Sequence, residues 1–413
     1  MKKGVTAYIL SLTAIVWALV SLSSCNLVED KEMDIGNTVL IYIAADNNLA
    51  SNARHNIEDL KAGDVPVWFN EGRGDVLLVY ADIAGEVPRL MRISKDRYGA
   101  VATEVLMEYP DTVNSIAPEV MSEVLSYAAS LFPSNRNGLV LWSHGTGWLP
   151  DDYYSRPYSS SGTVMPMSLD KDPYAIYVKS FGEDYDATEN MDIKDIAQAL
   201  PVHYSYILFD ACLMGGVEVA YELKDCCDYL VSSSAEILAA GFPYKEVSGY
   251  LLDGSLSSLK AMSDEYYRTY INDGATVSVV ETKALDALAS SVRTVLESGG
   301  ADSIPELDMD SLQGYFRRLW NGHSYYEPHW FYDLGDFISH IAPDEASLDA
   351  FQTAIESAVV YRRSTENFVL GNRVQFPIKT FSGLSTYVPN PENSYLDDYY
   401  RTLAWNQAVR MVR

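Results

Sequence analysis

The sequence predicts an α/β fold with a mainly parallel central sheet that is flanked by helices. Three observations support this class: nearly continuous apolar and β-branched runs, helical segments between them, and polar motifs directly after two of the runs. Strands that are buried on both faces give continuous hydrophobic runs rather than alternating patterns. Strands that alternate with helices form mainly parallel sheets through right-handed crossovers.

Each expected strand is a short run rich in apolar and β-branched residues. These runs lie at residues 38–44, 75–82, 138–143, 205–210, 229–234 and 276–282. The clearest helix is expected at residues 116–131, where the apolar residues keep helical spacing. Ser115 is its candidate cap, Pro118 falls in its first turn, and Pro133 is its stop signal.

Length and composition indicate one large folded unit with an extension. The chain has 413 residues, of which 48% are hydrophobic, so it can bury a large core and exceeds one typical small domain. We expect the large α/β unit at residues 36–287. Residues 288–413 have a mixed pattern rich in aromatic residues, which predicts a smaller C-terminal subdomain.

The surface is expected to be strongly acidic. The chain has 57 Asp and Glu residues against 30 Lys and Arg residues, a formal net charge of -27. Such a charge repels phosphate backbones and anionic lipids, so we expect no nucleic-acid partner. The simplest interpretation of the acidity is solubility, and the alternative is attraction of basic polypeptides.

The amino terminus resembles a bacterial lipoprotein export signal. Two lysines precede an apolar stretch at residues 5–22, and the sequence Leu-Ser-Ser before Cys25 matches the lipobox pattern. We therefore expect a signal peptide at residues 1–24, a lipid on Cys25, and a polar tether at residues 25–35. The lipid would attach the exported protein to a bacterial membrane. We expect the outer membrane, and the sequence does not indicate whether the protein is on its periplasmic or its outer face. The alternative is an uncleaved transmembrane anchor, because the apolar stretch nears spanning length.

Polar motifs directly follow two of the expected strands. Residues 142–148 read Trp-Ser-His-Gly-Thr-Gly-Trp, and residues 209–216 read Phe-Asp-Ala-Cys-Leu-Met-Gly-Gly. Open α/β sheets keep their chemistry at the carboxyl ends of their strands. We expect His144 and Cys212 to meet there as a dyad, because a catalytic thiol needs a base that can be remote in sequence. An isolated histidine would instead be interpreted as a core residue.

These motifs resemble those of the clostripain family of cysteine peptidases, which share the caspase-like fold. Further segments that resemble the family occur in the same order, at residues 45–49, 332–337 and 383–389. The resemblance implies a caspase-like α/β fold in which residues 36–287 form the catalytic domain. It also implies a cysteine endopeptidase that acts on polypeptides through an acyl-enzyme.

The resemblance also implies roles for the residues of the two motifs. Cys212 would attack a peptide carbonyl, and His144 would supply the acid–base function. The backbone N–H groups of Gly145 and Cys212 would bind the oxyanion, and glycine at 145 permits the close backbone approach that this needs. The apolar spacing further along predicts a helix that begins at Cys212, and its positive end would favour the thiolate.

Asp210 lies two residues before Cys212, and strand alternation puts both side chains on one side. By resemblance, Asp210 would line the pocket for the residue before the scissile bond, where a buried carboxylate pairs with Arg or Lys. A helix cap is the alternative role. Trypsin-like members of the family carry a second acid downstream, whereas residues 239–244 contain none and Glu236 is the closest substitute. A single pocket acid weakens the case for strict arginine specificity.

Residues 149–191 are expected to form a long surface loop between the two motifs. Pro, Gly, Ser, Asp and Tyr mix here without a sustained period, and loops of this length are usually functional or disordered. In the clostripain family this region can be cut on maturation. Arg156, Lys171 and Lys179 are the basic residues that self-cleavage would use, and the alternative is an uncut loop that shapes the cleft.

Cysteine use and the remaining motifs indicate a site without metal or cofactor. If Cys25 carries a lipid, three cysteines remain, so at least one thiol stays free. A disulfide from Cys212 to Cys226 or Cys227 is the alternative, although the expected helix would hold them beyond disulfide reach. No metal-ligand spacing or phosphate-binding loop occurs. Some members of the family use calcium, but no contiguous calcium loop supports it here.

Two other functions remain open from the sequence. One is a non-catalytic surface lipoprotein that binds peptides or glycans on the same fold. Cys212 and His144 together argue against it, because an inactive relative has no physical need for a thiol at that position. The other is a transferase or amidase that uses the same dyad and differs from a peptidase only in its substrate or acyl acceptor.

Overall fold

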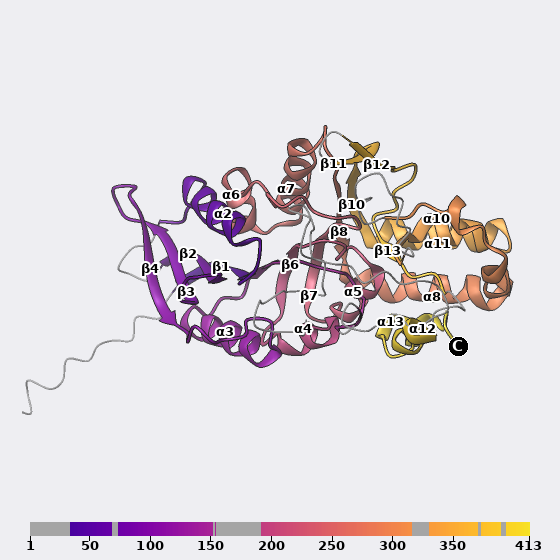
Figure 1. Cartoon of the computed structure of the whole chain (residues 1–413), viewed down its shortest axis with the longest axis horizontal. Coiled ribbons are helices and arrows are strands. Elements are labelled where there is room, and N and C mark those ends of the chain that lie inside the picture. Colours follow the sequence, from indigo (N-terminus) through magenta and orange to yellow (C-terminus); the bar gives the residue numbers. More distant parts are fainter. Residues whose placement is uncertain are drawn as a thin grey trace, which may run out of the picture.

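The computed structural model describes residues 34–67, 73–151, 153, 191–315, 330–370, 373–389 and 394–413. A nine-stranded sheet runs through the molecule in the order β10-β8-β7-β6-β5-β1-β2-β3-β4 (Figure 1). Helices cover both of its faces, so the predicted α/β class with a helix-flanked central sheet is confirmed.

The middle of the sheet is parallel. Its strands are β1 (Asp34–Ala45), β2 (Arg73–Ile83), β5 (Asn137–Trp142), β6 (Tyr204–Asp210) and β7 (Cys227–Ser232). Each coincides with one of the predicted runs. Most of their side chains are buried on both faces of the sheet, which is why the sequence shows continuous apolar runs here.

The two edges of the sheet are antiparallel. β8 (Thr276–Glu281) and β10 (Val359–Ser364) form one edge, and β3 (Arg89–Lys95) and β4 (Val101–Glu108) form the other. The sequence predicts β8 but misses β3, β4 and β10. β4 is exposed along most of its length, so it has no buried apolar run by which it could be found.

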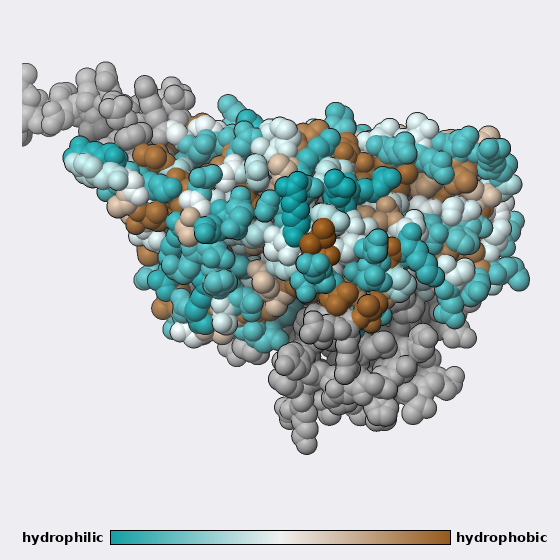
Figure 2. Space-filling view, turned by 90° about the horizontal axis from the view of Figure 1, so that it is seen from above, coloured by the Kyte–Doolittle hydropathy of each residue, from teal (hydrophilic) through white to brown (hydrophobic). Residues whose placement is uncertain are grey.

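Helices pack on both faces of the sheet. α2 (Ala50–Ala62), α6 (Tyr244–Asp253) and α7 (Leu256–Thr269) cover one face, and α3 (Pro118–Leu131), α4 (Ile193–Ala199) and α5 (Val217–Glu222) cover the other (Figure 1). The outer surface seen from the side of α6 and α7 is mainly hydrophilic, with apolar residues in separate small groups (Figure 2).

The predicted helix is α3, but its start differs from the expectation. The residue before its first turn is Ala117, and no side chain caps the helix. The predicted cap, Ser115, is instead buried, where its hydroxyl donates to the Asp82 carboxylate and bonds with the Tyr80 hydroxyl. The cap prediction is therefore wrong, because Ser115 serves a buried polar network between β2 and α3.

The C-terminal residues join the sheet and also extend beyond its β10 edge. The larger helices there are α8 (Leu285–Val295), α10 (Leu334–Ile341) and α11 (Glu345–Ala358), and smaller elements are β9 (Tyr332–Asp333), β11 (Asn367–Leu370), β12 (Arg373–Pro377), β13 (Ser385–Thr386), α12 (Ser394–Tyr400) and α13 (Ala404–Val409). Short helical turns lie at Thr282–Ala284, Leu296–Gly300, Ala301–Ser303, Ile304–Glu306 and Met309–Ser311. The boundary expected at residue 288 falls inside α8, and β10 completes the sheet.

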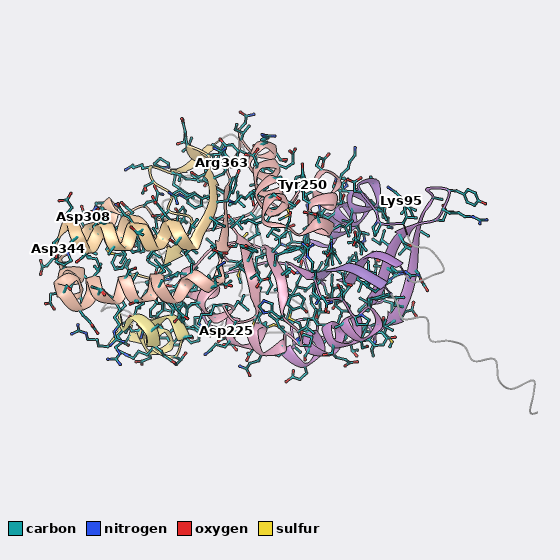
Figure 3. The ribbon with its side chains drawn as sticks, turned by 180° about the vertical axis from the view of Figure 1, so that it is seen from behind. Lys95, Asp225, Tyr250, Asp308, Asp344 and Arg363 are labelled. Carbon is teal, nitrogen blue, oxygen red and sulfur yellow. The ribbon has the colours of Figure 1, made fainter. Side chains whose placement is uncertain are left out.

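The surface carries the acidic residues that the net charge requires. Asp225, Asp308 and Asp344 are exposed and point outward from the molecule (Figure 3). Among the residues described, no helix combines the length and the apolar character needed to cross a membrane. Cys25 and the predicted signal peptide lie outside the described residues, so the structure does not test them.

Candidate active site

A small cavity of about 30 Å³ lies at the carboxyl ends of the parallel strands. Its walls include Trp142 and His144 at the end of β5, Asp210 and Cys212 at the end of β6, and Gly241 beyond β7. In the sheet, β1 has β2 as its neighbour on one side and β5 as its neighbour on the other, so the strand order reverses between β1 and β5. The cavity therefore lies near a topological switch point, where open α/β sheets bind their ligands.

His144 is buried, two residues after the end of β5. Its Nε2 lies 2.7 Å from Oδ1 of Asn48, a residue in the turn after β1. Because an amide oxygen only accepts, this contact places a hydrogen on Nε2 and orients the ring. No local pattern marks Asn48 as a partner of His144, although residues 45–49 form a segment that resembles the family.

Cys212 lies in a turn between β6 and α5. It does not begin a helix, because α5 starts only at Val217, so the predicted help from a helix terminus is wrong. The next residue, Leu213, has a φ of 62°, a left-handed conformation that costs about 1–2 kcal/mol for a residue with a side chain. Hydrogen bonds from Leu213 N to Ala235 O and from Gly215 N to Ser233 O hold this turn against the segment after β7.

The thiol of Cys212 contacts the backbone of Ile237 on that same segment. Ile237 N–H donates to Sγ at 3.3 Å, and Sγ lies 3.5 Å from the Ile237 carbonyl, which can accept the thiol hydrogen. The Ile237 N–H favours the thiolate, which is the reactive form, whereas the Ile237 carbonyl favours the neutral thiol. The backbone after β7 thus supplies the local polar contact that the helix terminus does not.

Gly145 brings the two motif segments into direct contact. A Cβ at this position would lie 2.6 Å from the carbonyl oxygen and 3.2 Å from the amide nitrogen of Cys212. Any side chain would therefore push the histidine and cysteine segments apart. The sequence-predicted residues Cys212, His144 and Gly145 lie together, with the two side chains lining one cavity.

Asp210 is buried at the end of β6 and also lines the cavity. Its Oδ2 accepts hydrogen bonds from the Phe242 N–H at 3.1 Å and the Tyr244 hydroxyl at 2.9 Å. Burial raises the pKa of Asp210 from its ordinary value to about 6, and these two donors partly oppose the shift. The alternative role as a cap for a helix at Cys212 fails, because no helix starts there.

Glu236 is buried beside the cavity wall but is not among the residues that line the cavity. The wall on this side is formed by Ile237, Leu238, Ala239 and Gly241. Asp210 is the only acidic side chain among the lining residues in the described part of the chain. The cavity is therefore a largely apolar space with one carboxylate.

Asn56 of α2 joins two walls of this cavity. Its Oδ1 accepts a hydrogen bond from Trp142 Nε1 at 3.0 Å, and its Nδ2 donates to the Ala240 carbonyl at 2.9 Å. The bridge fixes the segment after β7 against the end of β5. Nothing in the sequence marks Asn56, because its partners are remote along the chain.

A second buried carboxylate, Glu218, lies on α5 behind the Cys212 turn. Its Oε1 accepts hydrogen bonds from Thr386 Oγ1 at 2.8 Å, Tyr387 N at 2.9 Å and Tyr400 Oη at 2.7 Å. Burial raises its pKa above the ordinary value. Ser385 N also donates to the Gly215 carbonyl at 2.9 Å, so the C-terminal residues hold the cysteine turn in place.

Several predicted residues do not enter this site. The candidate cleavage residues Arg156, Lys171 and Lys179 lie outside the described part of the chain. Cys212, Cys226 and Cys227 form no disulfide with one another, so the alternative of a disulfide to Cys212 is wrong. Within the described ranges, no group of three or more His, Cys, Asp or Glu residues is placed to hold a metal ion.

Comparisons with known proteins fit this geometry. A model of the clostripain family matches residues 41–161 and 168–411. Clostripain from Hathewaya histolytica is 25% identical over 238 residues, which cover 51% of this chain. The match covers 41% of that relative, so the chain spans less than half of its length.

Two solved structures are similar to most of the chain. An inactive zymogen C11 protease from Parabacteroides distasonis has a TM-score of 0.74 and 31% identity, and the match covers 90% of this chain and 97% of that one. A secreted C11 cysteine protease from Bacteroides thetaiotaomicron, in complex with an irreversible peptide inhibitor, has a TM-score of 0.72 and 28% identity. That match covers 91% of this chain and 99% of the other.

Proposed function

The chain belongs to the clostripain family of cysteine peptidases, and from this premise we propose that it is an exported endopeptidase acting through Cys212 and His144. The observation that carries the proposal is the shared cavity, which both side chains line at the carboxyl edge of a caspase-like α/β fold. The contact of Gly145 with the Cys212 backbone supports the same arrangement.

In the proposed reaction, the Cys212 thiolate attacks the carbonyl carbon of the scissile peptide bond. The amides of Gly145 and Cys212 bind the oxyanion, and the C–N bond breaks as His144 protonates the leaving amine. Water then attacks the resulting thioester while His144 takes its proton. The C–S bond breaks, the carboxylic acid product leaves, and the Cys212 thiolate and the protonated His144 are restored.

The proposed substrates are polypeptides with arginine or lysine before the scissile bond. Asp210 supports this choice, because it places one carboxylate in an otherwise largely apolar cavity. A buried carboxylate pairs best with a cationic side chain. Glu236 is the second candidate for substrate binding, but it is buried and does not line the cavity, so Asp210 carries the proposal.

A panel of fluorogenic peptides tests the function. The peptides differ only in the residue before the scissile bond, and the full-length protein is compared with its Cys212→Ala and His144→Ala variants. We expect wild-type turnover to fall at least about 1000-fold in Cys212→Ala. Cys226→Ala is the matched control, because that half-buried thiol lies directly before β7, outside the cavity, and its loss should leave the rate unchanged. Equal turnover by wild type and Cys212→Ala would overturn the proposal.

Self-cleavage within residues 149–191 is also proposed as a maturation step. Incubation of the purified protein should give two fragments, and the Cys212→Ala variant should stay intact. Replacing Arg156, Lys171 and Lys179 together with glutamine should prevent the cut. A fragment pattern that persists in this triple variant would place the cut elsewhere.

Export and lipid attachment at Cys25 are the remaining parts of the proposal. The export signal in the sequence supports them, and one similar structure is of a secreted protease. In bacterial cells, the wild-type chain should incorporate labelled fatty acid, and Cys25→Ala should not.

No metal or cofactor is proposed, so a calcium chelator should leave peptide hydrolysis unchanged. A rate that the chelator abolishes and added calcium restores would contradict this.

A further inference from the structure

The two oxygen atoms of Asp210 have different surroundings. The hydrogen bonds from Phe242 N–H and Tyr244 Oη both end on Oδ2. A Cβ on Gly241 would lie 2.6 Å from the same oxygen and 3.2 Å from Oδ1, so the Gly241 backbone packs most closely on Oδ2. In the part of the chain that the structure describes, no hydrogen bond ends on Oδ1.

The groups around Oδ2 are held in place by their own contacts. Tyr244 is the first residue of α6 and is buried. The ring of Phe242 stacks on Tyr266, with 4.4 Å between ring centroids, and the Tyr270 hydroxyl donates to the Gly241 carbonyl at 2.6 Å. A substrate therefore cannot displace these donors from Oδ2 without breaking several packed contacts.

Arginine and lysine need different things from a carboxylate. A guanidinium binds best through two parallel N–H···O bonds, one to each oxygen. An ammonium is a compact point charge that can use a single oxygen. Asp210 is the only acidic side chain among the described residues that line the cavity, so no second carboxylate completes the fork for arginine.

We propose that the Tyr244 hydroxyl and the Phe242 amide, by occupying one oxygen of Asp210, make this pocket select lysine over arginine before the scissile bond. The inference rests on the proposed peptidase function and deepens it by naming the preferred substrate. Lysine Nζ binds Oδ1 in a charge-assisted hydrogen bond. Arginine reaches the same oxygen with one guanidinium N–H and leaves its other donors buried without an acceptor, which costs free energy of binding.

The test compares matched peptides with lysine, arginine or norleucine at this position. Norleucine is the uncharged straight-chain analogue, so it reports hydrolysis without the carboxylate contact. At pH 8 we expect wild-type kcat/KM to favour lysine over arginine by about tenfold, which is about the worth of one such hydrogen bond. Tyr244→Phe frees one position on Oδ2, so the lysine-to-arginine ratio should fall at least about fivefold with norleucine hydrolysis little changed.

Tyr266→Phe is the matched control. Its hydroxyl is buried beside the same segment but has no hydrogen-bond partner among the described residues. Removing it should leave the lysine-to-arginine ratio as in wild type, and thermal unfolding of both variants shows whether they fold.

Each outcome of this comparison decides between the two proposals. Turnover that depends on Cys212 but favours arginine, or a ratio that Tyr244→Phe does not change, would overturn the lysine inference and keep the peptidase. Cleavage of norleucine peptides alone would overturn both the basic preference and this inference. No cleavage of any peptide by wild type would contradict the proposed function itself.

Discussion

Two buried carboxylates flank the turn that carries Cys212, and only one of them lines the cavity. Asp210, before the turn, lines a cavity and accepts two hydrogen bonds on one oxygen. Glu218, after the turn, accepts three hydrogen bonds from the C-terminal residues and lines no part of that cavity. Burial raises the pKa of both groups above its ordinary value.

This difference assigns substrate binding to Asp210 and a structural role to Glu218. Burying a carboxylate costs free energy unless its partners compensate for lost hydration. Each carboxylate keeps one oxygen without a hydrogen bond among the described residues, Oδ1 of Asp210 and Oε2 of Glu218, but only Asp210 lines the cavity that a substrate cation can enter. At Glu218 the donors come from Thr386, Tyr387 and Tyr400, so the same chemistry links distant parts of the chain.

Replacing Glu218 should give the largest change in stability. Glu218→Ala removes the acceptor of three buried donors, of which only Thr386 Oγ1 has another acceptor nearby, the Tyr387 carbonyl, so we expect the free energy of unfolding to fall by about 3 kcal/mol. Urea denaturation followed by fluorescence measures this. A loss below about 1 kcal/mol would show that Glu218 does not anchor the C-terminal residues.

Glu218→Gln is the control, because its amide oxygen can accept the same three hydrogen bonds. Burial raises the pKa of Glu218, so the folded state favours the neutral acid, and its contribution to stability is lost as pH rises from the ordinary value through the raised one. Glutamine does not titrate. The stability of Glu218→Gln relative to wild type should therefore increase between pH 4 and pH 8.

Replacing Asp210 should affect activity with little effect on stability. Asp210→Asn keeps an oxygen for Phe242 and Tyr244 but removes the charge, so kcat/KM for lysine peptides should fall about 100-fold, or about 2.7 kcal/mol. Hydrolysis of the norleucine peptide and the free energy of unfolding should change little. Loss of stability comparable to that of Glu218→Ala would remove the distinction between the two carboxylates.

The pH dependence of substrate choice gives a smaller effect. Burial raises the pKa of Asp210 to about 6, so the side chain is mostly neutral below that pH and a carboxylate above it. The ratio of kcat/KM for lysine over norleucine should be constant above about pH 7 and about tenfold lower at pH 5. Titration of His144 affects both substrates and cancels in the ratio. A ratio that stays flat from pH 5 to pH 8 would contradict an ionised Asp210 as the lysine ligand.

The smallest effect is expected at Asn48, a positioning residue. Asn48→Ala removes the 2.7 Å contact to His144 Nε2, and kcat should fall about fivefold, the worth of one hydrogen bond. Asn48→Asp should keep the orientation and stabilise the imidazolium, which shifts the pH–rate profile of His144 upward. A profile unchanged in both variants would show that Asn48 does not act through the histidine.

Much of the fold could be predicted because a strand that is buried on both faces appears in the sequence as a continuous apolar run. The runs that became β1, β2, β5, β6 and β7 are apolar on both faces, so each is visible without knowledge of its neighbours. β4 and β10 show no such run, since their side chains are largely exposed or only partly buried. The sequence predicts Ser115 as a cap, and this is wrong because its partners, Tyr80 and Asp82, lie on another element.

The sequence by itself determined the class of the sheet, the family, and the motif residues His144, Gly145, Asp210 and Cys212. These can be recognised because each is defined by neighbours along the chain, at the end of an apolar run. Only the tertiary structure decided which other groups contact them, such as Asn48 on His144 and Tyr244 on Asp210. Amides and phenols are common residues, and their hydrogen-bond partners are fixed by packing between remote segments rather than by local pattern.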